Sequence, residues 1–225
     1  MPVPMNVSWI DLSLPVYAGS PVFPDQPSPT FFPWTTIDLH GNATNAFFMV
    51  EHTGTHLDVA SHFVTGGEDV DKISVDHFCG RAVVLDVSGL SEKKEISAKE
   101  IENICNTGKI IIQEGDIVLF HTGDDSLYGK PDYFNAYPGL SSDAAWLLVS
   151  KRVKAVGIDA PSIDHVPYLT HRIFLSAGVI IYEFLTHLKQ LLGQEVTFFG
   201  FPLKFIGCTG SPVRAVARIA GSSPE

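Results

Sequence analysis

The chain concentrates side chains that can bind a metal ion in one short segment. Residues 52–63 contain His52, His56, Asp58 and His62, at spacings of four, two and four. Imidazole nitrogens combined with a carboxylate oxygen are ligands that suit zinc, manganese or iron. A lone histidine is usually an ordinary core or surface residue, but three histidines and an aspartate interleaved with glycine and threonine indicate a metal or catalytic site. Structural zinc sites, by contrast, favour cysteine.

The spacing restricts the backbone that can bring these side chains to one ion. On a helix, His52 and His56 would share a face, whereas Asp58 would lie on nearly the opposite side. On a flat strand all four would share a face, but His52 and His56 would be about 13 Å apart, too far for metal bonds of about 2.1 Å. We therefore expect the chain to curl at the end of a strand, with Gly54 permitting the turn.

A second candidate cluster lies far along the chain, between residues 171 and 185. Glu183 falls inside an apolar strand pattern, and His171 precedes it by twelve residues. An ionised carboxylate in that setting needs a cation, a metal or several hydrogen-bond donors. From the pattern alone, an ion pair with Arg172, Arg214 or Arg218 is an equally good explanation.

Four further polar residues are secondary candidates: His121, Asp159, Asp164 and His165. Asp164 and His165 are adjacent and could form an acid–base pair, although nearby Pro161 indicates a loop. His40, His77 and His187 carry no such context, and we assign them to the surface or the core.

The hydrophobic pattern predicts the elements that must position these residues. We expect strands at 47–51, 82–87, 116–120, 153–158, 179–184 and 213–219. A capping box at Ser97–Glu100 predicts a helix through Ile104, and Ser141 or Ser142 caps another through about Lys151. Many strands with few helices predict α/β or α+β packing, in a single domain that spans residues 1–225.

The first 45 or so residues have a composition of their own. They hold more than half of the prolines, together with Phe23, Phe31, Phe32 and Trp34. Proline restricts the backbone and removes a hydrogen-bond donor, so regular structure is disfavoured there. We expect an ordered but irregular arm at about 1–45 that packs over the core or across a subunit interface.

Composition excludes several classes of protein. Twenty-five acidic against fifteen basic residues give a formal charge of −10, which argues against nucleic-acid binding. The longest apolar runs are too short to span a bilayer, and the N-terminus has no signal-peptide pattern, so we expect a cytoplasmic protein without membrane contact. Three separated cysteines without a Cys-x-x-Cys motif exclude a disulfide framework or a zinc ribbon.

Residues 52–63 also resemble a known signature. The pattern His-x-Gly-Thr-His-x-Asp-x-x-x-His-Phe is similar to that of the cyclase superfamily of metal-dependent hydrolases, which includes bacterial kynurenine formamidase and isatin hydrolase. Residues 11–15, 21–24, 121–123 and 156–164, and the pair His171 and Glu183, resemble its other blocks. The resemblance implies a swivelling β/α/β fold with a mixed central sheet and few helices, assembled as a homodimer or homotetramer.

The resemblance also assigns ligand roles. In the formamidase branch, the positions of His52, His56 and Asp58 bind one zinc ion. The Asp58 position bridges to a second zinc ion, which the positions of His171 and Glu183 complete. Related members use a single manganese ion, so zinc as one or two ions, or manganese, is implied.

Two more positions matter for the implied chemistry. His62 matches the proton-transfer residue, and Phe23 stands where the formamidase branch has a substrate-contacting Trp. Ala60 stands where the family usually has Pro, which affects local stiffness more than chemistry.

The resemblance implies hydrolysis of the C–N amide bond of a small aromatic or cyclic amide by metal-activated water, as in arylformamidases acting on N-formylkynurenine. Because Phe23 stands where the formamidase branch has Trp, the identity of the aromatic substrate stays open. One alternative is an isatin hydrolase-like cyclic amidase with a single manganese. Another is a cyclase or lyase that works through an enolate. A noncatalytic metal-stabilised module would bind metal without turnover.

Overall fold

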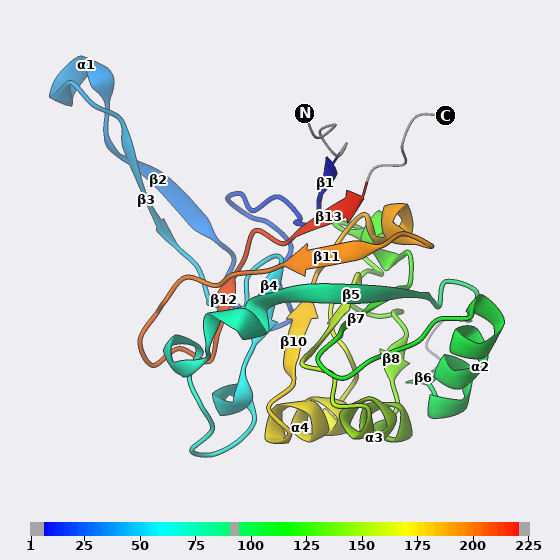
Figure 1. The fold of residues 1–225 in the computed structure, drawn as a ribbon. Coiled ribbons are helices and arrows are strands. Elements are labelled where there is room, and N and C mark those ends of the chain that lie inside the picture. Colours follow the sequence, from blue (N-terminus) through cyan, green and yellow to red (C-terminus); the bar gives the residue numbers. More distant parts are fainter. Residues whose placement is uncertain (1–6, 91–94, 221–225) are drawn as a thin grey trace, which may run out of the picture.

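A nine-stranded mixed sheet organises the computed structural model, which describes residues 7–90 and 95–220 (Figure 1). The strand order is β1–β13–β11–β5–β7–β9–β10–β4–β12. The four central neighbours β5, β7, β9 and β10 are parallel, and the flanking strands pair antiparallel. Their bounds are β1 Val7–Asp11, β4 His56–Asp58, β5 Cys79–Asp86, β7 Ile117–His121, β9 Ala155–Ile158, β10 Ile180–Glu183, β11 Val196–Phe199, β12 Gly210–Pro212 and β13 Val216–Ala220. Residues 1–6 of the expected arm and residues 221–225 lie outside the described residues.

Side chains of the central strands alternate between two apolar cores. Val118 and Phe120 of β7 enter the core beneath the helices, whereas Ile117 and Leu119 enter the core on the opposite face. This is the period-two alternation of a strand that is buried on both sides. The helices that cover the first core are α2 (Ala98–Gly108), α3 (Ser142–Ser150) and α4 (Leu169–Ser176) (Figure 1).

The expected α/β class, with a mixed sheet and few helices, is confirmed. The capping box of Ser97 and Glu100 opens α2, and Ser141 caps α3 through its hydroxyl. Helix α2 continues to Gly108, four residues beyond the expected end. Helix α4 and strand β11 were not expected, and neither was the short pair of β6 (Glu95–Ile96) and β8 (Gly139–Leu140). In the described part of the chain, no helix has the length and apolar character needed to cross a membrane.

The expected arm is irregular only in part. Residues 30–48 form a hairpin of β2 (Thr30–Thr35) and β3 (Thr44–Phe48), with the short helix α1 (Ile37–His40) at its tip. The hairpin projects away from the rest of the molecule (Figure 1). Earlier in the arm Leu12 is fully buried in the core, but the side chains of Trp34, Phe47 and Phe48 are exposed. The strand expected at 47–51 is therefore shifted, because the chain turns after residue 48 toward the histidine-rich segment.

A buried ion pair joins the C-terminal ends of β7 and β9. His121 Nδ1 lies 2.8 Å from Asp159 Oδ2, and the other carboxylate oxygen of Asp159 accepts hydrogen bonds from the Thr122 backbone and hydroxyl. The hydrogen bond to Asp159 raises the pKa of His121; burial opposes this, and the carboxylates of Asp86 and Asp125 add to it.

This pair should make the stability of the fold depend on pH. A raised histidine pKa contributes stability that is complete below about pH 6.5, the ordinary value, and is lost as pH rises through the folded-state pKa. We expect the difference in free energy of unfolding between the wild type and His121→Gln to shrink from about pH 6 to about pH 9 in urea titrations. Asp159→Asn should remove the same trend. A difference that stays constant with pH would contradict this account.

Candidate metal centre

Strand β4 places two of the predicted site residues in the sheet and the preceding turn brings in a third. β4 pairs antiparallel with β10, so that His56 lies opposite Glu183 and Asp58 opposite Ile181. Just before β4, Gly54 has a φ of 64°, in the left-handed region that favours glycine. The turn folds the chain back until the rings of His52 and His56 are 5.2 Å apart. The curl expected at Gly54 is present.

The turn and the β4–β10 pairing bring the carboxylates and imidazoles of both predicted clusters together. One oxygen of Asp58 lies 2.7 Å from His52 Nδ1 and 3.3 Å from His56 Nε2, and its other oxygen lies 3.5 Å from His171 Nε2. Glu183 lies 3.2 Å from His171 Nε2 and 3.7 Å from His56 Nε2. Two groups, His52–His56–Asp58 and Asp58–His171–Glu183, each hold their potential ligand atoms within 4.8 Å of one another. They share Asp58.

The second ring nitrogen of each of two histidines is anchored away from the cluster. His56 Nδ1 lies 2.8 Å from the carbonyl oxygen of Gly54, and His171 Nδ1 lies 2.5 Å from Asp164 Oδ1. A donated N–H at Nδ1 leaves Nε2 as the unprotonated nitrogen, and Nε2 is the atom that faces the cluster. The anchoring therefore orients both rings with a free lone pair toward the carboxylates.

His52 is anchored by two residues that the sequence pattern did not single out. Its Nε2 lies 3.0 Å from Thr209 Oγ1, and the Thr209 hydroxyl and backbone N–H both donate to Glu51 Oε1, at 2.5 and 3.1 Å. Glu51 and Thr209 are 158 residues apart in the chain, so no local motif links them. Their contact leaves His52 Nδ1 directed at Asp58.

Asp164 links the first turn of helix α4 to the site. One carboxylate oxygen of Asp164 accepts the backbone N–H groups of Thr170 and His171, at 2.8 and 3.1 Å, while the other contacts the His171 ring. The sequence-based pairing of Asp164 with His165 is wrong. The His165 ring instead stacks on Tyr137 and contacts its backbone carbonyl oxygen.

Both carboxylates of the cluster are removed from solvent. Asp58 is 1% and Glu183 5% exposed, and the ionisable partners described for them are histidines. The three arginines considered as ion-pair partners of Glu183 contact other groups instead. Arg172 donates to the Phe63 carbonyl oxygen, Arg214 pairs with Asp11, and Arg218 contacts Thr197.

The electrostatics of the cluster favour positive charge between the carboxylates. Burial disfavours the imidazolium form of His52, yet Asp58 and Glu51 raise its pKa to about 10. Burial likewise opposes charge on His171, but Asp164, Asp58 and Glu183 raise its pKa well above the usual value. Protonated rings can supply this charge only by giving up their lone pairs, whereas a divalent cation would use the same nitrogens as ligands. The residues present fit such a cation.

The ring of His62 packs on a cluster residue, whereas the ring of Phe23 packs on another aromatic ring. The His62 ring stacks on His52, with centroids 4.0 Å apart, and its Nδ1 lies 3.5 Å from Thr209 Oγ1. Unlike the cluster residues, His62 is exposed to solvent. Phe23 is half-buried and packs edge-on against Phe134, with centroids 6.0 Å apart.

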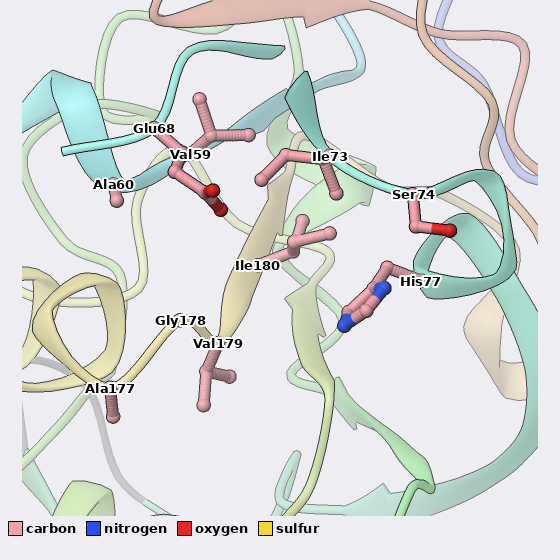
Figure 2. A pocket seen from close by; sticks show the side chains of 10 residues that line it. All are labelled: Val59, Ala60, Glu68, Ile73, Ser74, His77, Ala177, Gly178, Val179 and Ile180. Carbon is pink, nitrogen blue, oxygen red and sulfur yellow. The ribbon is translucent and has the colours of Figure 1, made fainter. Parts of the chain in front are cut away.

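A separate hollow of about 250 Å³ is lined by residues next to β4 and at the start of β10. Val59 and Ala60, which follow β4, form part of its wall, and Ile180 at the start of β10 forms another part (Figure 2). The side chains of Glu68 and His77 point into it. None of the cluster residues lines this hollow, so it is distinct from the candidate metal centre.

Replacing Gly54 should disrupt the cluster without touching a ligand. A Cβ at this position would lie 2.6 Å from Val16 Cγ2, and a left-handed conformation costs a residue with a side chain about 1–2 kcal/mol. We expect Gly54→Ala to lower the melting temperature and the metal content per chain, measured by calorimetry and elemental analysis. Gly193→Ala, at a left-handed glycine with open space around it, should lower stability alone. Full metal content in Gly54→Ala would contradict the role of the turn.

Comparison with known proteins identifies the family of this chain. The Cyclase family model matches residues 10–165. Kynurenine formamidase from Bacillus mycoides (strain KBAB4) is 30% identical over 215 residues, covering 93% of this chain and 97% of that protein. Isatin hydrolase A from Ralstonia solanacearum has a TM-score of 0.87 at 26% identity, over 95% of this chain and 92% of that chain. Isatin hydrolase A from Labrenzia aggregata, bound to benzyl benzoate, also has a TM-score of 0.87 at 26% identity, over 96% and 94%. This chain belongs to the cyclase family.

Proposed function

We propose that this protein is a metal-dependent amidohydrolase that cleaves the C–N bond of a small aromatic N-formyl amide. The observation that carries the proposal is the pair of groups that share Asp58, each with buried carboxylate and imidazole donors facing one another. The cyclase family and its kynurenine formamidase relatives support an amide as the substrate.

The donor set supports a divalent cation of the zinc or manganese type. His52, His56 and Asp58 would hold one ion, and Asp58, His171 and Glu183 a second. Imidazole and carboxylate ligands suit both metals, so zinc as one or two ions is our first assignment and manganese the second. Such an ion polarises an acyl carbonyl and lowers the pKa of bound water to about 7.

His62 is placed to move the proton in this reaction. Its ring lies against His52 at the solvent side of the cluster, within 3.5 Å of the Thr209 hydroxyl. As general base it would accept the proton of the water whose oxygen attacks the acyl carbon. As general acid it would then return that proton to the nitrogen when the C–N bond breaks, which yields a carboxylic acid and an amine.

The second candidate substrate is a cyclic amide. The similarity of the fold to that of isatin hydrolases supports a cyclic amide as substrate. Its intramolecular C–N bond would be opened by the same attack on the carbonyl carbon. A panel of N-formylkynurenine, formanilide and isatin distinguishes the two. Incorporation of ¹⁸O from solvent into the product would separate hydrolysis from lyase chemistry.

Two substitutions should separate metal binding from proton transfer. We expect His62→Ala to retain metal and lose about 10²–10⁴-fold in kcat, because a positioned acid–base group contributes that much. We expect Glu183→Gln to lose metal and to lose activity at least about 100-fold. Elemental analysis and initial rates on the panel measure both effects.

His77→Ala, which alters a histidine outside the cluster, is the matched control and should keep both metal and activity. Chelation should abolish turnover, and added zinc or manganese should restore it. Full activity in His62→Ala would remove the role of that residue. A purified protein that neither binds these metals nor turns over any member of the panel would remove the proposed function.

We also propose that two copies of the chain associate through the β2–β3 hairpin, as a homodimer or as part of a homotetramer. An isolated two-stranded hairpin has little stability in water, and this one exposes apolar side chains on both faces. Trp34 is 70% and Leu39 81% exposed, and Phe31, Phe32, Ile37, Phe47 and Phe48 are exposed with them. Seven such side chains offer on the order of 700 Å² of apolar surface, close to the roughly 800 Å² that each partner buries in a stable complex.

Light scattering after gel filtration tests this assembly. We expect the wild type to elute with at least twice the mass of one chain, and the double variant Trp34→Glu, Phe48→Glu to elute as a monomer. A paired substitution at the exposed residues Val75 and Ile111, away from the hairpin, serves as the control. A wild type that stays monomeric at micromolar concentration would contradict the proposal.

We propose a cytoplasmic location and a single working domain for the chain. All three cysteines are free, as suits a reducing compartment. The candidate site joins residues from His52 to Thr209, so both halves of the chain are needed to build it.

A further inference from the structure

A line of aromatic rings connects the metal-binding cluster with the N-terminal arm. The His56 ring lies 5.7 Å from the ring of Phe184, which follows Glu183 in the chain. Phe184 lies 6.1 Å from Phe134, and Phe134 lies 6.0 Å from Phe23 in an edge-on contact. Phe134 belongs to the segment between the short 3-10 helix Asp124–Leu127 and β8, to which the sequence pattern assigned no role.

The rings along this line differ in their exposure. Phe184 is 2% exposed and Tyr133 1%, so neither offers surface to a ligand. Phe134 and Phe23 are only half-buried. Tyr133 packs on both Phe134 and Phe184, with centroids 5.1 and 5.8 Å apart. The buried pair therefore holds Phe134 in place, and Phe134 is the partly exposed ring that is fewer ring contacts from His56 along this line.

The ring that supports Phe134 is itself rigidly held. Phe184 has a φ of 55°, a left-handed conformation that is unfavourable for a bulky residue. Its carbonyl oxygen accepts a 2.5 Å hydrogen bond from the Thr55 hydroxyl, and its N–H donates to the carbonyl oxygen of Ala160. These contacts fix Phe184, and through it Phe134, relative to His56 and Glu183.

We propose that Phe134 is a specificity-determining residue whose ring receives the aromatic part of the substrate, while the acyl group lies at the cluster. The inference deepens the proposed function and rests on it. Phe134 lies two ring contacts from His56, a separation that one aromatic ring with an attached amide can bridge. Offset and edge-on ring contacts are favourable, whereas an aliphatic group gains only the burial of its surface.

The substitution Phe134→Leu tests the assignment with two substrates of similar size. We expect the ratio of kcat/KM for formanilide to that for N-formylcyclohexylamine to fall about fivefold to tenfold. The loss should appear in KM, with kcat and metal content little changed. Phe134→Tyr should restore the ratio, because it keeps the ring.

Phe199→Leu is the matched control. Phe199 is also half-buried and also packs against aromatic rings, those of Trp9 and Phe201, but it lies on β11 and contacts none of the cluster's rings. Its substitution should leave the ratio unchanged. An unchanged ratio in Phe134→Leu, or an equal fall in Phe199→Leu, would overturn the proposal.

Binding of formanilide to the zinc-loaded protein, measured by calorimetry, separates this inference from the proposed function. If the wild type binds formanilide without hydrolysing it and Phe134→Leu binds it at least about fivefold more weakly, the subsite stands although the function fails. If both proteins bind it equally, or if the wild type does not bind it, the subsite assignment is wrong. If Phe134→Leu does not fold, formanilide binding is compared instead between Phe134→Tyr and Phe134→Ile at lower temperature.

Discussion

Two carboxylates buried beside three imidazoles are the constraint on which the rest of the structure depends. Asp58 and Glu183 lie where water cannot solvate their charge, and the described basic side chains near them are histidines. An uncompensated buried carboxylate is strongly unfavourable, so this arrangement is stable only with positive charge between the two groups. Folding of the β4–β10 region should therefore be linked to metal binding, since a cation binds the assembled donors and not the unfolded chain.

Backbone in the left-handed region flanks three segments that present candidate ligands. Gly54 precedes β4, Phe184 follows Glu183, and Tyr168 precedes the helix that carries His171, and all three have positive φ. For Phe184 and Tyr168 this conformation costs about 1–2 kcal/mol each. Packing against Tyr133 and the hydrogen bond from Thr55 hold Phe184 in this conformation directly after Glu183. Two of the six described non-glycine residues with positive φ therefore lie next to elements that present candidate ligands.

Local spacing was sufficient to predict one half of the site. The spacing of His52, His56 and Asp58 excludes a helix and a flat strand, and the turn at Gly54 is the remaining solution that the structure contains. The central parallel strands were also predictable, since apolar runs mark β5, β7, β9 and β10. For Glu183 the pattern indicated only that a positive partner was required. Whether that partner was an arginine or a metal cluster depended on contacts with β4 and α4, which sequence spacing does not contain.

Neither helix α4 nor the orientation of His171 could be predicted from the sequence, because both depend on hydrogen bonds to Asp164. The segment Leu169–Ser176 has no side-chain N-cap of its own, because Tyr168 occupies that position. Asp164, outside the helix, instead accepts two of its first backbone N–H groups and also the ring N–H of His171. The sequence pattern suggested that Asp164 pairs with its neighbour His165, but in the loop the His165 ring contacts Tyr137 instead. One carboxylate thus begins the helix and orients its ligand, so the helix and the second half of the site form together.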